Sequence, residues 1–274
     1  MSTPRPSETV TRYALLTLVA AGTIAPLIIV LLTAFHEPGE SVSGISWPKH
    51  WSWHTFSSAW KAGGFDEAFR SSAVIAVAVV AIVTAAATAV GYACATMRFP
   101  GSRAFFYLFV AGMVVPYVVL VVPIYLEFQK ADLLDSYWGI VLAESGLYLP
   151  FGVFWMHAFF SSIPRSLIES ARLDGATSYR VLLQILLPIG RPVVATLMML
   201  TFLASWNEYL VPLILAGNGK IQTVSQGLAS FQGQHLTDVP SLSAAAILVA
   251  VPAVMIYLIT QRSFFRGLLQ GAIK

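Results

Sequence analysis

Apolar and polar positions divide the chain into six long apolar runs that are separated by shorter polar segments. A helix needs about 20 consecutive apolar residues to cross a bilayer core of about 30 Å. The pattern therefore predicts an all-α polytopic membrane protein with six transmembrane helices. These predicted helices cover residues 13–35, 72–97, 104–128, 137–160, 192–216 and 242–260. The first run is longer than the apolar region of a signal peptide, and no convincing cleavage site follows it, so we expect a membrane helix there.

A polar island, residues 161–191, separates the fourth run from the fifth and predicts two short amphipathic helices. Pro164 suits the first turn of a helix, and Ser162 is a candidate cap. Gly175 can adopt the left-handed geometry that ends a helix. Between them, one apolar face recurs at helical spacing, formed by Leu167, Ile168 and Ala171.

The second short helix of the island is expected to begin at a cap provided by Thr177 or Ser178. Pro188 is expected to stop it. Its apolar stripe consists of Val181, Leu182, Ile185 and Leu186. Both helices are too short and too polar to cross a bilayer, and periodicity alone favours ordinary helices that lie on the membrane surface.

The island resembles the Glu-Ala-Ala/Gly/Ile-x-Leu-Pro loop of ABC-importer permeases. The matching residues are Glu169, Ala171, Gly175, Ile185, Leu187 and Pro188, whereas Ser170 stands where the pattern has alanine. The resemblance implies a type I ABC importer permease fold in which residues 1–274 form a single transmembrane permease domain. It also implies that residues 161–191 carry a cytoplasmic coupling helix, between helices 4 and 5, that docks into a groove on an ATPase subunit.

Taken with the apolar faces, the resemblance gives a set of expected ATPase-coupling residues. This set is Leu167, Ile168, Glu169, Ser170, Ala171, Asp174, Gly175, Ala176, Ile185, Leu187 and Pro188. We expect the apolar face of the first short helix to lie in the groove of the partner, in the helix-in-groove mode of recognition. Glu169 and Asp174 are candidates for capping or for pairing with a basic residue, or they are simply solvated charges.

Composition and charge placement agree with a membrane protein whose two termini are both cytoplasmic. Hydrophobic residues make up 57% of the chain and charged residues 11%, against about 25% charged in a soluble domain. If the amino terminus is inside, eleven of the sixteen basic residues lie on the cytoplasmic side, as the positive-inside rule requires. They are Arg5, Arg12, Arg98, Arg103, Arg165, Arg172, Arg180, Arg191, Arg262, Arg266 and Lys274. We therefore expect a multi-pass protein of the cell (inner) membrane.

Motifs for catalysis or nucleotide binding are missing from the sequence. The one Gly-Lys pair, Gly219-Lys220, precedes isoleucine and lacks the spacing of a phosphate-binding loop. Cys94 is the sole cysteine, which excludes an intrachain disulfide and a cysteine-pair metal site. We therefore expect a non-catalytic subunit with no cofactor or metal of its own, and with ATP and Mg bound by partner ATPase subunits.

Two acidic residues fall inside predicted membrane helices, where a charge costs about 2.5–3.5 kcal/mol and normally faces a bundle interior or a cavity. Glu208 lies in the fifth helix beside aromatic residues, a combination that suits sugar hydroxyls and ring faces, and Glu144 lies in the fourth. The alternative role is interhelical hydrogen bonding. The candidate substrate-path residues are Trp206, Asn207, Glu208, Tyr209 and Glu144.

The segment at 206–213 and the tail at 264–274 resemble the shorter permease of the maltose-type carbohydrate importers. This resemblance implies half of a translocation pathway for a carbohydrate. The implied partners are a second homologous permease (a heterodimer), two cytoplasmic ATP-binding subunits, an extracytoplasmic solute-binding protein and the lipid bilayer, but no nucleic acid.

Two alternatives to a carbohydrate importer remain open. One is an ABC permease for another solute, such as glycerol phosphate or a polyamine, although no predicted membrane helix has a basic interior for a phosphorylated substrate. The other is an ion-coupled secondary transporter, a class that typically shows internal repeats.

Overall fold

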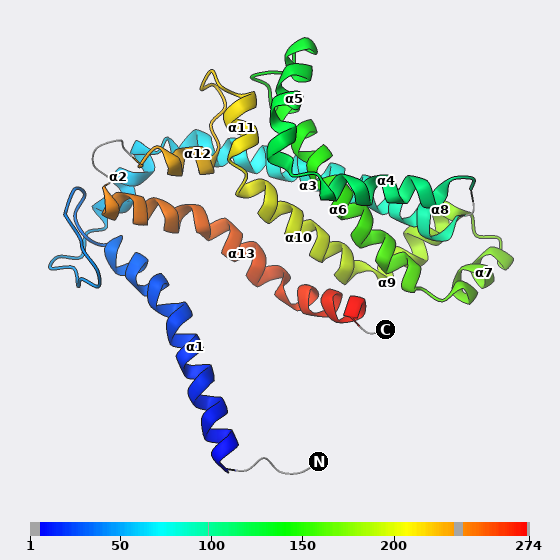
Figure 1. Ribbon diagram of the computed structural model, residues 1–274, viewed down its shortest axis with the longest axis horizontal. Helices are drawn as coiled ribbons and strands as arrows, with labels where there is room; N and C mark the ends of the chain where they lie inside the picture. The colour runs from blue at the N-terminus through cyan, green and yellow to red at the C-terminus, as the bar shows by residue number, and fades with distance from the viewer. Residues whose placement is uncertain (1–5, 98, 233–237, 273–274) are drawn as a thin grey trace. The chain divides into compact units, whose positions relative to one another are not determined.

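The computed structural model describes residues 6–97, 99–232 and 238–272 (Figure 1). Arg5, Arg98 and Lys274, which the charge argument used, lie outside the described residues, as do the side chains beyond residue 262. The described residues are helical or irregular and contain no strand, which confirms the predicted all-α class. The chain divides into two compact units, one formed by residues 1–66 with 227–251 and the other by residues 67–226 with 252–274.

Four helices of the described chain are long and apolar enough to cross a membrane, and they match predicted spans. They are α1 (Pro6–Thr33), α3 (Phe65–Thr96), α6 (Tyr137–Ser162) and α13 (Val239–Ala272). The apolar part of α1, Arg12–Thr33, is about 33 Å long at 1.5 Å per residue, and only 6% of its apolar window is buried. Such an exposed apolar surface is stable in lipid rather than in water.

The third predicted span is divided into α4 (Ser102–Val114) and α5 (Tyr117–Lys130), which are bent by 103°. Pro116 is the residue that caps α5, and its extended conformation interrupts the helix, as proline favours. Pro123, by contrast, is accommodated inside α5. The pair can count as one broken span, and so can Ser178–Ile189 with α10 (Arg191–Trp206), which are bent by 81°. With both pairs included, the number of candidate spans is six.

The predicted continuous fifth helix at 192–216 is wrong in one respect, because it is broken. Helix α10 ends at Trp206, and α11 (Leu210–Leu215) begins after an interruption at residues 207–209. Both pieces pack against α6, and α11 also packs against α5. The interruption therefore lies between two helices that share α6 as their support.

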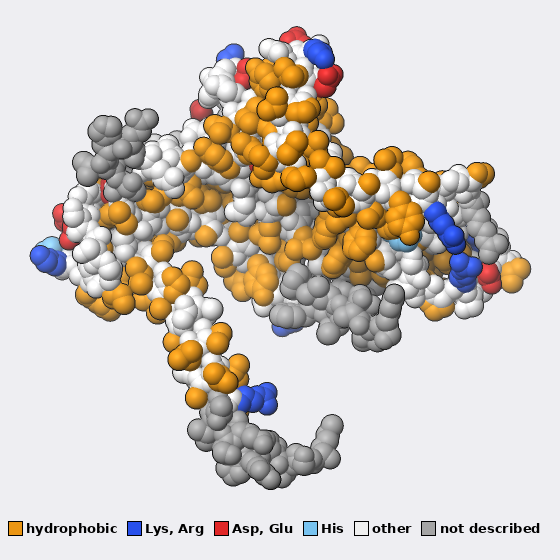
Figure 2. All heavy atoms as spheres, viewed as in Figure 1, with side chains coloured by type: hydrophobic (Ala, Val, Ile, Leu, Met, Phe, Trp, Pro, Cys, Tyr) orange, Lys and Arg blue, Asp and Glu red, His pale blue; other side chains and the backbone are white. Residues whose placement is uncertain are grey.

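The larger unit has two apolar cores, which lie toward opposite ends of α3 and α6. One joins the middle of α3 to the start of α6 and to α11. The other joins the end of α3 and the end of α6 to the segment that follows. That segment consists of α7 (Arg165–Leu173), α8 (Ser178–Arg180), the π-helix η1 (Val181–Leu186) and α9 (Leu187–Ile189). Figure 1 shows α7, α8 and α9 together at one end of this unit, and Figure 2 shows basic side chains gathered at the same end.

The smaller unit holds an aromatic cluster around Phe35, just after α1. The Phe35 ring lies 5.0 Å from the ring of Trp51 and 4.9 Å from that of Trp53. The next residue, His36, is buried, and its Nδ1 lies 3.1 Å from the Leu32 carbonyl oxygen. The same unit includes α2 (His54–Ala62) and part of α12 (Val224–Ala229).

Candidate functional site

In the loop formed by α7 to α9, both ends of the first helix, α7, are set by backbone geometry rather than by side-chain caps. Pro164 precedes α7 in an extended conformation and makes no capping hydrogen bond. The expected cap by Ser162 is wrong, because its hydroxyl donates to the Phe159 carbonyl at 2.7 Å. At the other end, Gly175 has a φ of +80° and lies in the left-handed region, as predicted.

A Schellman motif closes α7 at this glycine. The Gly175 N–H donates to the Arg172 carbonyl, and the Ala176 N–H donates to the Ala171 carbonyl, each at 3.0 Å. A Cβ at position 175 would meet nothing within 4 Å. Strain from a substitution would therefore come from the backbone conformation and not from a clash.

The apolar face of α7 packs onto the chain's own core, which corrects the expectation that it enters a groove on a partner. Ile168 is 7% exposed and Ala171 is 8% exposed. Both belong to a buried cluster with Val181 and Leu186 of the following helix, and Leu167 packs against the same cluster. The predicted amphipathic pattern of α7 is confirmed, but its apolar face contacts the second short helix and the ends of α3 and α6.

The second short helix is capped by Thr177, because its hydroxyl oxygen accepts a hydrogen bond from the Arg180 N–H at 3.4 Å. The Tyr92 hydroxyl of α3 donates to the Ser178 carbonyl at 3.1 Å and ties α8 to the long helix. The expectation that Pro188 stops this helix is wrong, because Pro188 lies inside α9 and the chain leaves the helix at Gly190. The π turn just before Pro188 offers the physical reason: a proline ring would clash with the carbonyl four residues back in a regular α-helix, and a wider turn relieves this.

The exposed face of the loop is the surface that a partner could contact. Leu173 is 89% exposed and Tyr179 is 70% exposed, although both are large apolar side chains. Glu169 and Asp174 are exposed as well, and within the described residues neither forms an ion pair or accepts a hydrogen bond. Ser170 bonds within its own helix, where its hydroxyl donates to the Ser166 carbonyl at 2.6 Å.

The remaining predicted loop residues take intermediate positions. Ala176, Ile185 and Leu187 are half-buried, and Pro188 is exposed. Sequence reasoning missed Leu173 and Tyr179 because it looked for apolar stripes. Leu173 lies two residues past Ala171, off the stripe and on the polar face of α7, and an apolar residue at such a position is the signal that would have found it.

The break between α10 and α11 is organised by Glu208. One of its carboxylate oxygens, Oε1, accepts from the N–H groups of Leu210 at 3.0 Å and Val211 at 3.2 Å. The other oxygen, Oε2, accepts from the hydroxyl of Tyr148 on α6 at 2.9 Å. Glu208 therefore caps α11 and joins it to α6, which accounts for a carboxylate inside a predicted membrane helix.

Glu144 is fully buried one turn before Tyr148 on α6. Its Oε2 accepts a hydrogen bond from the hydroxyl of Ser205 on α10. Its other oxygen, Oε1, and the neighbouring Ser145 hydroxyl have no hydrogen-bond partner among the described residues. This pairing matches the interhelical role that the sequence left open.

The other candidate path residues separate into buried and exposed groups. Trp206 is 3% exposed and lies 5.4 Å from the ring of Phe202 in a stacked arrangement. Asn207 is exposed, and its side-chain amide donates to the Leu203 carbonyl at 2.7 Å, which covers the end of α10. Tyr209 is 40% exposed. Asn207 and Tyr209 are therefore the accessible members of the set.

Comparisons with known proteins agree with this architecture. The family model described as "Binding-protein-dependent transport system inner membrane component" matches residues 87–270. The diacetylchitobiose uptake system permease protein NgcG of Streptomyces coelicolor is 30% identical over 265 residues, which are 96% of this chain and 88% of that protein. The melibiose/raffinose/stachyose import permease protein MelC of Bacillus subtilis is 27% identical over 258 residues, 94% of each chain.

A solved structure supports the fold independently. A chain of a bacterial ABC transporter involved in the import of the acidic polysaccharide alginate superposes with a TM-score of 0.80 at 18% identity, covering 96% of this chain and all of that one. The protein is a non-catalytic, multi-pass membrane subunit, a permease of an ABC importer. The chain belongs to the family of binding-protein-dependent transport system inner membrane components.

Proposed function

We propose that this permease forms half of the translocation pathway of an ATP-driven importer for an oligosaccharide or another carbohydrate. Several relatives are named for the uptake of diacetylchitobiose, of melibiose, raffinose and stachyose, or of maltodextrin. The other half would be a second permease, the solute would arrive on an extracytoplasmic binding protein, and ATP and Mg would be bound by two ATPase subunits. Both termini and the loop of α7 to α9 would lie in the cytoplasm.

The loop of α7 to α9 is proposed to transmit ATPase movement to the membrane helices. The observation that carries this proposal is the exposure of Leu173, an apolar side chain that is 89% accessible at the end of α7. Because the inner face of α7 is packed on the ends of α3 and α6, a force applied to Leu173 and Tyr179 would reach both long helices. Contacts that differ between the two ATPase states would supply the bias that such a switch requires.

Asn207 and Tyr209, the exposed residues at the break between α10 and α11, are the residues proposed to meet the solute. Glu208 and Glu144 would affect the solute only indirectly, because their carboxylates already accept hydrogen bonds from groups of the protein. A sugar contact at Asn207 would compete with its hydrogen bond to the Leu203 carbonyl.

The test is stimulation of ATP hydrolysis in the complete complex, reconstituted in proteoliposomes with its solute-binding protein. Di- and oligosaccharides are expected to stimulate hydrolysis, whereas glycerol phosphate and spermidine are expected not to stimulate it. Stimulation by glycerol phosphate or spermidine alone would contradict the carbohydrate assignment. Hydrolysis that no solute stimulates, together with uptake driven by an ion gradient, would contradict the importer mechanism itself.

A further inference from the structure

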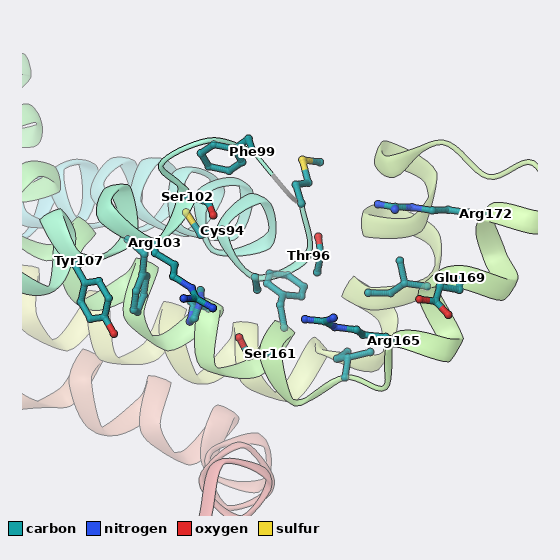
Figure 3. Close-up of a pocket in the computed structure, with 17 residues that line it drawn as sticks. Cys94, Thr96, Phe99, Ser102, Arg103, Tyr107, Ser161, Arg165, Glu169 and Arg172 are labelled. Carbon is teal, nitrogen blue, oxygen red and sulfur yellow. The ribbon is translucent and has the colours of Figure 1, made fainter.

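A cavity of about 1220 Å³ is lined by one side of α7, beside its packed inner face, and by the ends of three other helices (Figure 3). The end of α3, the start of α4, the end of α6 and α7 from Arg165 to Arg172 all line it. Its volume exceeds the roughly 300–1,000 Å³ typical of small-molecule pockets, so it has room for a ligand and its water. All of its lining residues belong to the larger unit.

The charge of this cavity is strongly unbalanced. Arg103 on α4 and Arg165 and Arg172 on α7 line it, together with a single acidic residue, Glu169. Figure 3 shows the three arginine side chains extending from two different elements toward the same space. Among the described residues, no carboxylate lies within 4.0 Å of any of the three guanidinium groups.

Helix dipoles do not add to the excess of positive charge around the cavity. The amino-terminal ends of α4 and α7 border the cavity, and so do the carboxy-terminal ends of α3 and α6. Each end carries a partial charge of roughly half an elementary charge, and two ends of each sign offset one another. The arginines therefore set the sign of the field.

Two neutral hydrogen-bond donors also line the cavity. They are the hydroxyls of Ser102 and Tyr107, and neither has a hydrogen-bond partner among the described residues. Guanidinium groups bind phosphate through two parallel hydrogen bonds, which gives such pairs both strength and geometry. Three unpaired arginines with two free hydroxyls form a donor set that suits a phosphate group.

We propose that this cavity binds a phosphate-bearing anion through Arg103, Arg165 and Arg172. The ligand would join α7 to the first turn of α4, and these two elements otherwise share no ion pair among the described residues. The phosphate could belong to a soluble metabolite or to the headgroup of an anionic lipid, because the same chemistry serves both. Its consequence for transport rests on the proposed coupling role of α7: an occupied cavity would hold α7 in one position and slow ATP turnover.

The test measures access to a thiol placed inside the cavity of the complete complex. Cys94 lines the cavity and is the sole cysteine of the chain, so Cys94→Ala with Ser161→Cys leaves one exposed reporter on its wall. Labelling of this cysteine by a maleimide is followed by mass spectrometry of the permease, in nanodiscs of phosphatidylcholine. One arm adds glycerol phosphate at constant ionic strength, and the other replaces part of the lipid with phosphatidylglycerol.

Protection is expected in one of the two arms, and this arm identifies the source of the phosphate. At a tenfold excess over Kd, about a tenth of the cavities stay empty, so labelling should slow about tenfold. The double variant Arg103→Gln and Arg165→Gln should lose the protection. Arg180→Gln, a basic residue of the same loop that does not line the cavity, should keep it.

Three outcomes would overturn the proposal. They are unchanged labelling in both arms, protection that survives the loss of Arg103 and Arg165, and loss of the ATPase subunits from the purified variant. The third would assign the arginines to the protein partner instead of an anion. Thiol protection does not depend on coupled hydrolysis. The anion-binding proposal can therefore fail while the proposed transport function stands, and the transport function can fail while the anion-binding proposal stands.

Discussion

Replacing Leu173 with alanine is expected to weaken the hold of the ATPase on the permease without unfolding the permease. The side chain is 89% exposed, so its removal costs the isolated chain almost no packing. If docking buries this side chain, the substitution removes three carbon atoms from an apolar contact, which at about 0.8 kcal/mol each, scaled by exposure, is about 2 kcal/mol. At 1.4 kcal/mol per factor of ten, this weakens binding about 30-fold.

Titration of the purified ATPase subunit onto the reconstituted permeases measures this loss directly. Solute-stimulated hydrolysis should require about 30-fold more ATPase subunit to reach half of its maximum. The control is Leu108→Ala on α4, the same chemical change at a side chain that is 67% exposed on a candidate membrane span. It should leave the titration unchanged. An unshifted titration for Leu173→Ala would refute the assignment of this side chain to the interface.

Three further substitutions test the loop and the helix break. Gly175→Ala forces an L-residue into the left-handed region at a φ of +80°; this should lower the free energy of unfolding by about 1–2 kcal/mol and lower the Tm. The control is Gly146→Ala, where an added Cβ also has no neighbour within 4 Å, and this variant should not lower the Tm. Ile168→Ala opens a hole in the core and should cost about 2–5 kcal/mol, with loss of folded protein on urea titration. Glu208→Ala leaves two N–H groups of α11 uncapped and should cost about 1 kcal/mol in the same titration, whereas Glu208→Gln, which keeps an acceptor oxygen, should cost less. Equal stability of the alanine and glutamine variants would argue against the capping role.

The membrane spans could be predicted from the sequence because apolar length is a strong local signal. Helix α6 begins at Tyr137 as predicted and ends two residues beyond the predicted 160. The kink at Pro116 could be predicted as well, because a proline removes a backbone donor. The break after Trp206 could not be predicted, because an apolar run does not show that the Glu208 carboxylate will cap a new helix.

The candidate site was predictable in outline but not in orientation. The spacing of Leu167, Ile168 and Ala171 indicates an apolar face, and Gly175 indicates where the helix ends. Periodicity does not show whether an apolar face packs on its own chain or on a partner, and here it packs on its own chain. The arginine-lined cavity lay beyond sequence reasoning because Arg103 and Arg165 are 62 positions apart along the chain, and only the packing of α4 against α6 brings their helices together.

Disulfide cross-linking from position 173 tests the central claim most directly. A Leu173→Cys variant in the Cys94→Ala background should cross-link to a cysteine in the groove of the ATPase subunit, and the yield should change with bound nucleotide. Ile168→Cys, whose parent side chain is 7% exposed and faces the chain's own core, should not cross-link. If the thiol introduced at position 173 reacted only with an impermeant reagent added outside the cell, and formed no cross-link to the ATPase, the account would be contradicted.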